Sequence, residues 1–238
     1  MKKAIIVGAS SGVGRELAKI LTENGYKVGI TARRKHLLEE LAAEKPDSYC
    51  VKDFDVMNTE KIIPNLDELV KELGGLDLLI ISAGVIKYNV DLDYEIEYRT
   101  NAVNVTGFTL MSNWAFNYFR KQKYGHLVGL TSVAGFRGWR NNPAYNASKA
   151  YEINYLEGLR NLAQYEKLPI TVTNIIPGYM ETKMMGKTLV FWVCSAEKAA
   201  RQIYTAIRKK KKIAYVDKRW RLGAFIYKRV PNKIIEIA

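Results

Sequence analysis

The chain has 238 residues, of which 48% are hydrophobic and 26% charged, a composition that is typical of folded globular proteins and excludes disordered or fibrous ones. Its net charge of +13 is concentrated at one end, because residues 201–238 contain twelve Lys or Arg and two acids, out of 37 and 24 in the whole chain. The two cysteines have no CxxC spacing and no histidine at ligand spacing, so neither a disulfide framework nor a metal site is expected.

The N-terminal residues give no sign of export. Three residues precede the apolar run 4–8, which is too short for a secretory signal. The longest uncharged stretch, residues 100–119, contains four asparagines and is too polar for a membrane span. We therefore expect a soluble, cytoplasmic protein.

Short apolar segments alternate with helical patterns along the chain. The expected strands are residues 4–8, 27–31, 48–56, 76–82, 126–132, 170–178 and 211–216. The expected helices are residues 14–24, 36–44, 60–73, 94–120, 144–166 and 197–208. This alternation predicts an α/β fold, a single-domain Rossmann-type doubly wound parallel sheet of about seven strands flanked by helices. We expect this domain to cover residues 1–216, with a substrate loop at about 179–195, and a basic, aromatic extension to follow at 217–238.

A glycine-rich turn follows the first expected strand and opens the first helix. The sequence VGASSGVGRELA has the spacing G-x-x-x-G-x-G, which lets the backbone turn tightly and lets a pyrophosphate approach the helix N-terminus. A tight strand-to-helix turn without a ligand is the alternative. The cofactor-binding candidates in this turn are Gly8, Ser10, Ser11, Gly12, Val13 and Gly14.

The ends of the next three strands supply further cofactor candidates. The second strand ends in TARR, which has no acid for a ribose 2′-hydroxyl but has guanidinium groups for a 2′-phosphate, so NADP(H) is favoured, with Arg33 as first choice. A solvated helix start is the alternative. Asp55 and Val56 follow the third strand, where an adenine ring would lie. Ala83 and Gly84 follow the fourth, where small residues let the backbone pass close to a cofactor.

Two segments contain a tyrosine and a lysine four residues apart. Tyr145 and Lys149 begin an expected helix, on which residues four apart share a face. Tyr179 and Lys183 follow Pro177 and Gly178 in an expected loop, where nothing need bring them together. The first pair is therefore the candidate for chemistry.

These motifs in this order resemble the classical short-chain dehydrogenase/reductase family, over about residues 3–182. The resemblance rests on GASSGVG, SAG, NVTG, a serine thirteen residues before a tyrosine, YNASK and PGYMET. It implies that the catalytic residues are Asn104, Ser132, Tyr145 and Lys149. It also implies that the cofactor is bound by Tyr145, Lys149, Pro177, Gly178 and Thr182, with Thr182 on its nicotinamide side. Ser82 stands where the family often has asparagine, which leaves these candidates unchanged.

The implied reaction is an NADP(H)-dependent reduction of a ketone or aldehyde, or oxidation of the alcohol. Tyr145 would be the general acid/base, since a nearby cation such as Lys149 stabilises a phenolate. Ser132 would hydrogen-bond the carbonyl oxygen, and Asn104 would hold a water that connects Lys149 to solvent. The alternative is a non-catalytic NADP(H)-binding or membrane-recruited interaction protein on the same fold.

Aromatic residues suggest a hydrophobic carbonyl or alcohol as substrate. Phe136, Trp139, Phe191 and Trp192 follow the fifth and sixth strands, where they would line an apolar cleft. Packing within the core or an interface is an equally good interpretation. Apolar residues on the helices at 104–120 and 151–166, together with the resemblance, favour a homodimer, with a tetramer as the alternative.

The C-terminal extension is basic and aromatic. A helix from Lys218 would place Trp220, Gly223, Ala224 and Tyr227 on one stripe, although Leu222 and Ile226 interrupt the amphipathic pattern (the residues of 217–238 are otherwise largely basic or apolar). One interpretation is peripheral contact with an anionic membrane, and the other is a basic flap over the substrate cleft. No nucleic-acid-reading motif accompanies the charge, so nucleic acid is not an expected partner.

Overall fold

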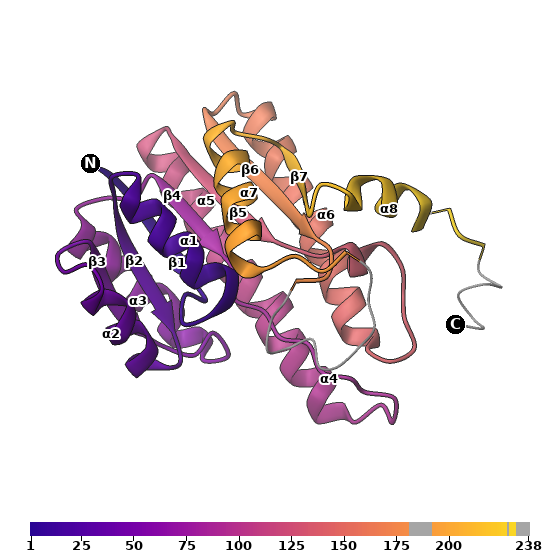
Figure 1. Cartoon of the computed structure of the whole chain (residues 1–238). Helices are drawn as coiled ribbons and strands as arrows, with labels where there is room; N and C mark the ends of the chain where they lie inside the picture. Colours follow the sequence, from indigo (N-terminus) through magenta and orange to yellow (C-terminus); the bar gives the residue numbers. More distant parts are fainter. Residues whose placement is uncertain (181–191, 228, 232–238) are drawn as a thin grey trace.

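The computed structural model of the chain describes residues 1–180, 192–227 and 229–231. Seven strands form one parallel sheet in the order β3-β2-β1-β4-β5-β6-β7, so the chain winds outward from β1 in both directions (Figure 1). The strands are β1 (Lys2–Val7), β2 (Tyr26–Ala32), β3 (Tyr49–Asp53), β4 (Leu78–Ile81), β5 (Gly125–Leu130), β6 (Ile170–Pro177) and β7 (Ile213–Val216). The predicted fold class is confirmed.

Helices cover both faces of this sheet. They are α1 (Gly12–Glu23), α2 (Lys35–Ala43), α3 (Thr59–Leu73), α4 (Tyr94–Asn101), α5 (Phe108–Gln122), α6 (Pro143–Tyr165), α7 (Ala196–Arg208) and α8 (Trp220–Tyr227). Successive residues of a strand point to opposite faces. Ile5 and Val7 accordingly pack in one core with α3, α5 and α6, whereas Ala4 and Ile6 pack in a second core with α1, α2 and α7. The ligand-binding edge of such a sheet lies at the carboxyl ends of its strands.

The helical segment expected at 94–120 is present, but its middle is not α-helical. The structure contains α4, then a π-helical segment η1 (Ala102–Gly107), and then α5. A π-helical turn inserts an extra residue into the turn, and such turns are frequent at functional sites. A side chain on Gly107 would come within 2.9 Å of the Val56 carbonyl oxygen, so this part of the helix lies tightly against the loop after β3.

The basic C-terminal residues do not form one cluster. Residues 208–212 precede β7, and Lys218, Arg219 and Arg221 follow it. Because β7 runs parallel to the other strands, the first group lies where the strands begin and the second group lies where they end. We call these two sides of the sheet its amino edge and its carboxyl edge. The charge that the sequence concentrates in one segment is therefore divided by the fold.

In the described residues, no helix is both long and apolar enough to cross a membrane.

Candidate active site

The turn between β1 and α1 depends on glycines at two positions where a side chain would not fit. Gly8 has a φ of +95°, and a Cβ there would lie 2.6 Å from the backbone nitrogen of Ala83. A Cβ on Gly14 would overlap the Gly8 carbonyl oxygen. The end of β1 thus lies tightly against the chain that follows β4, and the first turn of α1 lies tightly against Gly8. The first amides of α1 have no partner within the helix and are available to an anion.

A cleft of about 590 Å³ opens at the carboxyl edge of the sheet, beside this turn. It collects most of the predicted cofactor residues, namely Gly8, Ser10, Ser11, Gly12, Val13, Arg33, Asp55, Val56, Ala83, Gly84, Tyr145, Lys149 and Pro177. Gly14 lies behind Gly8 and does not line the cleft. Gly178 is covered by the indole ring of Trp220 from α8. Thr182 lies outside the described residues.

Two arginines reach the cleft from the end of β2. Nη1 of Arg33 lies 3.8 Å from Oδ2 of Asp55. Nη2 of Arg34 donates hydrogen bonds of 2.8 Å to the hydroxyls of both Ser10 and Ser11, so it lies against the glycine turn. The sequence prediction considered both arginines of TARR and put Arg33 first. The doubled arginine was the signal for Arg34, but only the structure places both guanidinium groups at one edge of the cleft.

Asn104 is fully buried in η1 and holds the chain after β4. Its Oδ1 accepts from the amide of Val85, and its Nδ2 donates to the Val85 carbonyl and to Ser148 Oγ, at 2.9, 2.9 and 3.1 Å. A Cβ on Gly84 would lie 3.4 Å from Lys149 Nζ and 3.5 Å from Asn104 Oδ1. The asparagine therefore fixes the backbone that borders the lysine. Its role in holding a water stays a prediction.

Ser132 ends the extended segment after β5 and begins a short 3-10 helix, η2 (Val133–Phe136). Its Oγ accepts from the amide of Ala134 at 3.1 Å. Asn146 of α6 donates to the Ala134 carbonyl at 2.8 Å, which ties η2 to the start of α6. This tie holds the serine segment against the helix that carries Tyr145.

Replacing Gly135 with alanine should loosen that contact. A Cβ there would lie 2.6 Å from the backbone carbon of Lys149, so η2 must move away from α6. We expect a loss of stability of about 1–3 kcal/mol and reduced turnover. Gly138→Ala is the matched control in the same loop, because nothing lies within 4 Å of its added methyl group. Denaturation midpoints of the two variants test the prediction, which equal midpoints would contradict.

Tyr145 and Lys149 are adjacent on the first turns of α6. Lys149 Nζ lies 5.8 Å from the centroid of the Tyr145 ring, and the lysine side chain is 5% exposed. The ammonium donates to both carboxylate oxygens of Glu152 at 2.8 Å and to the Leu130 carbonyl at 3.3 Å. Lys149 is thus held between a buried carboxylate and the cleft.

Sequence reasoning missed Glu152, which is completely buried. Its spacing of three residues from Lys149 was the available signal, since residues three apart on a helix lie on one face. Burial raises the pKa of Glu152 from its ordinary value of 4.5 to about 7, and the Lys149 ammonium opposes this shift. The negative charge on Glu152 that faces the Lys149 ammonium therefore changes with pH near neutrality.

Folding stability should consequently fall as pH rises from about 4.5 through about 7. A raised carboxyl pKa means that the folded chain keeps a proton there that the unfolded chain has lost, a difference on the order of 3 kcal/mol. Glu152→Gln cannot titrate and should flatten this slope. Glu157→Gln, at an exposed position on the same helix, should keep it. Denaturant titrations at about pH 5 and about pH 8 test this, and a slope unchanged in Glu152→Gln would contradict it.

The second tyrosine–lysine pair is only half described. Tyr179 follows β6 and is 44% exposed, whereas Lys183 lies outside the described residues. Burial raises the pKa of Tyr179, with smaller contributions from Tyr88 and Tyr145. The expectation that nothing brings Tyr179 and Lys183 together stays a prediction.

The aromatic residues predicted to line a substrate cleft have different locations. Phe136 packs with Val133 and Ala224, between η2 and α8. The Trp192 ring lies 5.7 Å from that of Trp220 and lines a second hollow beside α8. Trp139 is half-buried, and Phe191 lies outside the described residues. For Phe136 and Trp192, the packing interpretation agrees with the observed contacts.

The chain thus has a doubly wound α/β fold whose cleft places a tyrosine–lysine pair beside a glycine turn. The family model of the short chain dehydrogenases matches residues 2–189. An uncharacterized oxidoreductase of Staphylococcus aureus is 33% identical over 188 residues, which is 76% of this chain and 79% of the relative. An uncharacterized oxidoreductase of Mycobacterium tuberculosis is 34% identical over 196 residues, 79% of this chain and 76% of the relative.

A solved structure has the same fold at low identity. The closed form of a serine dehydrogenase complexed with NADP+ has a TM-score of 0.80 and 21% identity, covering 90% of this chain and 93% of that one. Together with the family match, these similarities establish the class. The chain belongs to the short-chain dehydrogenase family and is an oxidoreductase of that family.

Proposed function

We propose that this chain is an NADP(H)-dependent oxidoreductase that reduces a hydrophobic ketone or aldehyde, or oxidises the corresponding alcohol. The observation that carries the proposal is that Tyr145 and Lys149 line the same cleft as the glycine turn and the two arginines. A tyrosine and a lysine that served only to stabilise the helix would not need to lie beside the glycine turn and the arginines. The relatives' names and the NADP+-bound structural neighbour are consistent with it.

The residues of the cleft fit a nicotinamide dinucleotide with a 2′-phosphate. The glycine turn and the first residues of α1 line the cleft, so the free amides at this helix N-terminus would bind the pyrophosphate. Arg33 and Arg34 would pair with the 2′-phosphate, and Asp55 and Val56 would contact the adenine. When bound, the cofactor supplies or accepts the hydride.

The chain's own residues would carry out the proton transfer to and from the substrate oxygen. Tyr145 gives its hydroxyl proton to the carbonyl oxygen in reduction and takes it back in oxidation. Lys149 stabilises the phenolate that remains, and Ser132 hydrogen-bonds the carbonyl oxygen and orients it. Asn104 fixes the backbone around Lys149 and, with a bound water, would connect the lysine to solvent. Glu152 holds the ammonium in position from the side away from solvent.

A second candidate is a non-catalytic NADP(H)-binding protein on the same fold. The observation in its favour is the buried Lys149–Glu152 pair, since a purely structural lysine makes the same contacts. The direct test is a screen of ketones, aldehydes and alcohols of graded chain length, followed by cofactor absorbance with NADPH and NADH side by side. Turnover of apolar carbonyls with NADPH supports the enzyme. NADPH binding without turnover of any substrate supports the second candidate.

We further propose a homodimer, with α5 and α6 as the contact surface. Phe108, Trp114 and Leu159 belong to the chain's own core, so they no longer argue for an interface. What remains is the stacked pair of Tyr151 and Tyr155 on α6, with ring centroids 5.6 Å apart and both side chains partly exposed. Sedimentation velocity on the full chain measures its oligomeric state, and a monomer would contradict the proposal.

A further inference from the structure

Helix α8 is apolar on two sides. Its inner side carries Trp220 and the buried Ala224, which pack against Val133 and Ile176 of the domain. Its outer side carries Leu222, Phe225 and Ile226, which are 62%, 56% and 54% exposed. The two residues that interrupted the amphipathic pattern in the sequence therefore belong to a second apolar face. We call Leu222, Phe225 and Ile226 the outer face.

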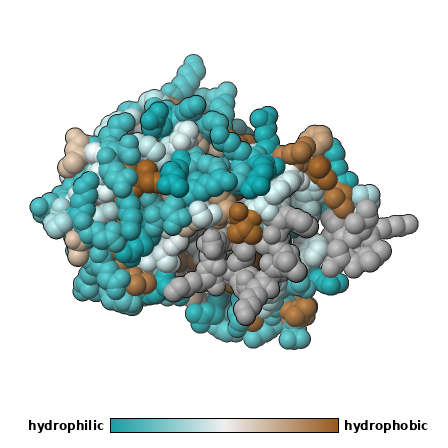
Figure 2. All heavy atoms as spheres, in the orientation of Figure 1, coloured by the Kyte–Doolittle hydropathy of each residue, from teal (hydrophilic) through white to brown (hydrophobic). Residues whose placement is uncertain are grey.

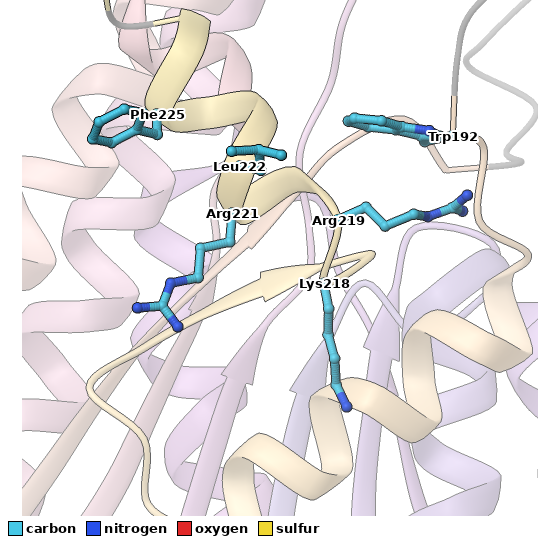
Figure 3. Close-up of a pocket in the computed structure, with 6 residues that line it drawn as sticks. All are labelled: Trp192, Lys218, Arg219, Arg221, Leu222 and Phe225. Carbon is cyan, nitrogen blue, oxygen red and sulfur yellow. The ribbon is translucent and has the colours of Figure 1, made fainter.

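The outer face continues into a hollow of about 610 Å³. Figure 3 shows Leu222 lying between the rings of Phe225 and Trp192. Trp192 comes from the segment before α7, so two separate parts of the chain contribute to one apolar surface. In Figure 2, apolar side chains also gather over the region that α8 occupies in Figure 1. Contiguous exposed apolar surface of this kind marks an interaction site.

Cations surround this surface. Lys218, Arg219 and Arg221 line the hollow, and the Arg219 guanidinium lies 5.8 Å from the Trp192 ring. The Arg229 guanidinium lies 3.7 Å from the Phe225 ring, so it covers the far end of the outer face.

The sequence has no acid between Asp217 and Glu236, and Asp217 is already neutralised. Asp217 is buried, and the side chains of Arg219 and Lys198 bond to it at 2.8 and 2.9 Å. The hydrogen bond from Arg219 is the main cause that holds the pKa of Asp217 below its ordinary value. The surface around α8 is thus apolar and cationic, which complements an apolar partner with a negative rim.

The helix is held in place by the domain. The Trp220 ring lies directly on Gly178, and it packs against the ring of Tyr179 at 5.5 Å. Nη1 of Arg137 donates to the Val230 carbonyl at 2.9 Å and ties down the residues after α8. Figure 1 shows α8 extending away from the sheet and its covering helices. The outer face is therefore presented by a fixed element at the carboxyl edge of the sheet, next to the cleft.

We propose that the outer face of α8, together with Trp192, docks on a bilayer surface that contains anionic phospholipid. Leu222, Phe225 and Ile226 enter the region between headgroups and acyl chains, and the surrounding Lys and Arg side chains contact lipid phosphates. Apolar side chains and cations act together in this way in peripheral membrane binding. A second copy of the chain fits less well, because three apolar side chains are few beside the roughly 20–30 residues that a stable interface uses on each side.

The proposal does not depend on the chemistry of the cleft and is tested by vesicle binding of the full chain. We expect co-sedimentation with vesicles of phosphatidylcholine and phosphatidylglycerol and much weaker binding to phosphatidylcholine alone. Leu222→Ser combined with Phe225→Ser should weaken binding at least about tenfold. Lys218→Gln combined with Arg221→Gln should weaken it about 30-fold.

Two matched controls test whether binding depends on the outer face itself or only on the total charge and exposed apolar surface of the chain. Lys209→Gln with Lys210→Gln removes the same charge from the opposite edge of the sheet. Val90→Ser with Leu92→Ser removes exposed apolar side chains far along the chain from α8. Both controls should bind anionic vesicles as the wild type does. Quenching of tryptophan fluorescence by bilayer-embedded nitroxide lipids should fall in Trp192→Phe, because Trp192 would lie at headgroup depth.

Three results would overturn the proposal. They are equal binding to neutral and anionic vesicles, an equal loss in the Lys209/Lys210 control, and unchanged binding of the Leu222/Phe225 variant. If the wild type sediments as an oligomer and the Leu222/Phe225 variant sediments as a monomer, the outer face is an interface between copies of the chain. Circular dichroism of every variant checks that the exposed substitutions leave the fold intact.

Discussion

Replacing Tyr145 with phenylalanine should lower turnover of any carbonyl substrate by about 100- to 10,000-fold, the usual contribution of a positioned general acid. The substitution removes one hydroxyl from a ring that lies 5.8 Å from Lys149 Nζ, and it leaves the glycine turn and the arginines unchanged. NADPH affinity should therefore stay within about threefold of the wild type. Steady-state turnover and a binding isotherm, measured on the same preparation, separate the two effects.

Tyr165→Phe is the control for this experiment, because Tyr165 ends the same helix and is 86% exposed. It should keep full activity. Retention of turnover in Tyr145→Phe would remove the proposed mechanism, and absence of turnover in the wild type with normal NADPH binding would favour the non-catalytic candidate.

Replacing Arg33 and Arg34 by alanine together should change the cofactor preference. Each guanidinium would make a charge-assisted hydrogen bond to the 2′-phosphate, and such bonds contribute about 1.5–3 kcal/mol, so each loss should weaken NADPH binding about 10- to 100-fold. NADH has no 2′-phosphate, and its affinity should change little. Single variants show which arginine contributes more, and Arg34 has the better defined position because it bonds to Ser10 and Ser11.

Lys35→Ala is the matched control for the arginines. Lys35 is the next cation along the chain, but it begins α2, is mostly exposed and pairs with Glu39 at 3.6 Å. Its loss should leave NADPH affinity unchanged. Equal weakening of NADPH and NADH binding in the arginine variants would contradict recognition of the 2′-phosphate.

Much of the fold was predictable because its signals are local. Apolar runs of strand length alternate with helical patterns, and the structure confirms the parallel sheet and its flanking helices. The close approach of Gly14 to Gly8 also follows from the glycine spacing, since both residues belong to the same strand-to-helix turn. The π-helical segment within the helix at 94–120 was the exception, because one residue inserted into a turn leaves no composition signal.

The predicted site is partly a local pattern and partly a product of packing. Tyr145 and Lys149 face the cleft together because they lie four apart on a helix, which the sequence alone determines. The bond between Asn104 and Ser148 joins residues 44 positions apart. No spacing rule contains such a contact, and it exists because η1 and α6 pack against each other.

By itself, the sequence determined the fold class, the glycine turn and the placement of Tyr145 and Lys149 on one face of a helix, since each depends on residues close together in the chain. Tertiary structure alone decided that Glu152 is buried against Lys149, that Trp220 covers Gly178, and that α8 has an outer apolar face. It also divided the basic C-terminal residues between two edges of the sheet. The physical reason is that burial and proximity depend on how elements pack, and a side chain's neighbours across an interface are not encoded in the periodicity of its own segment.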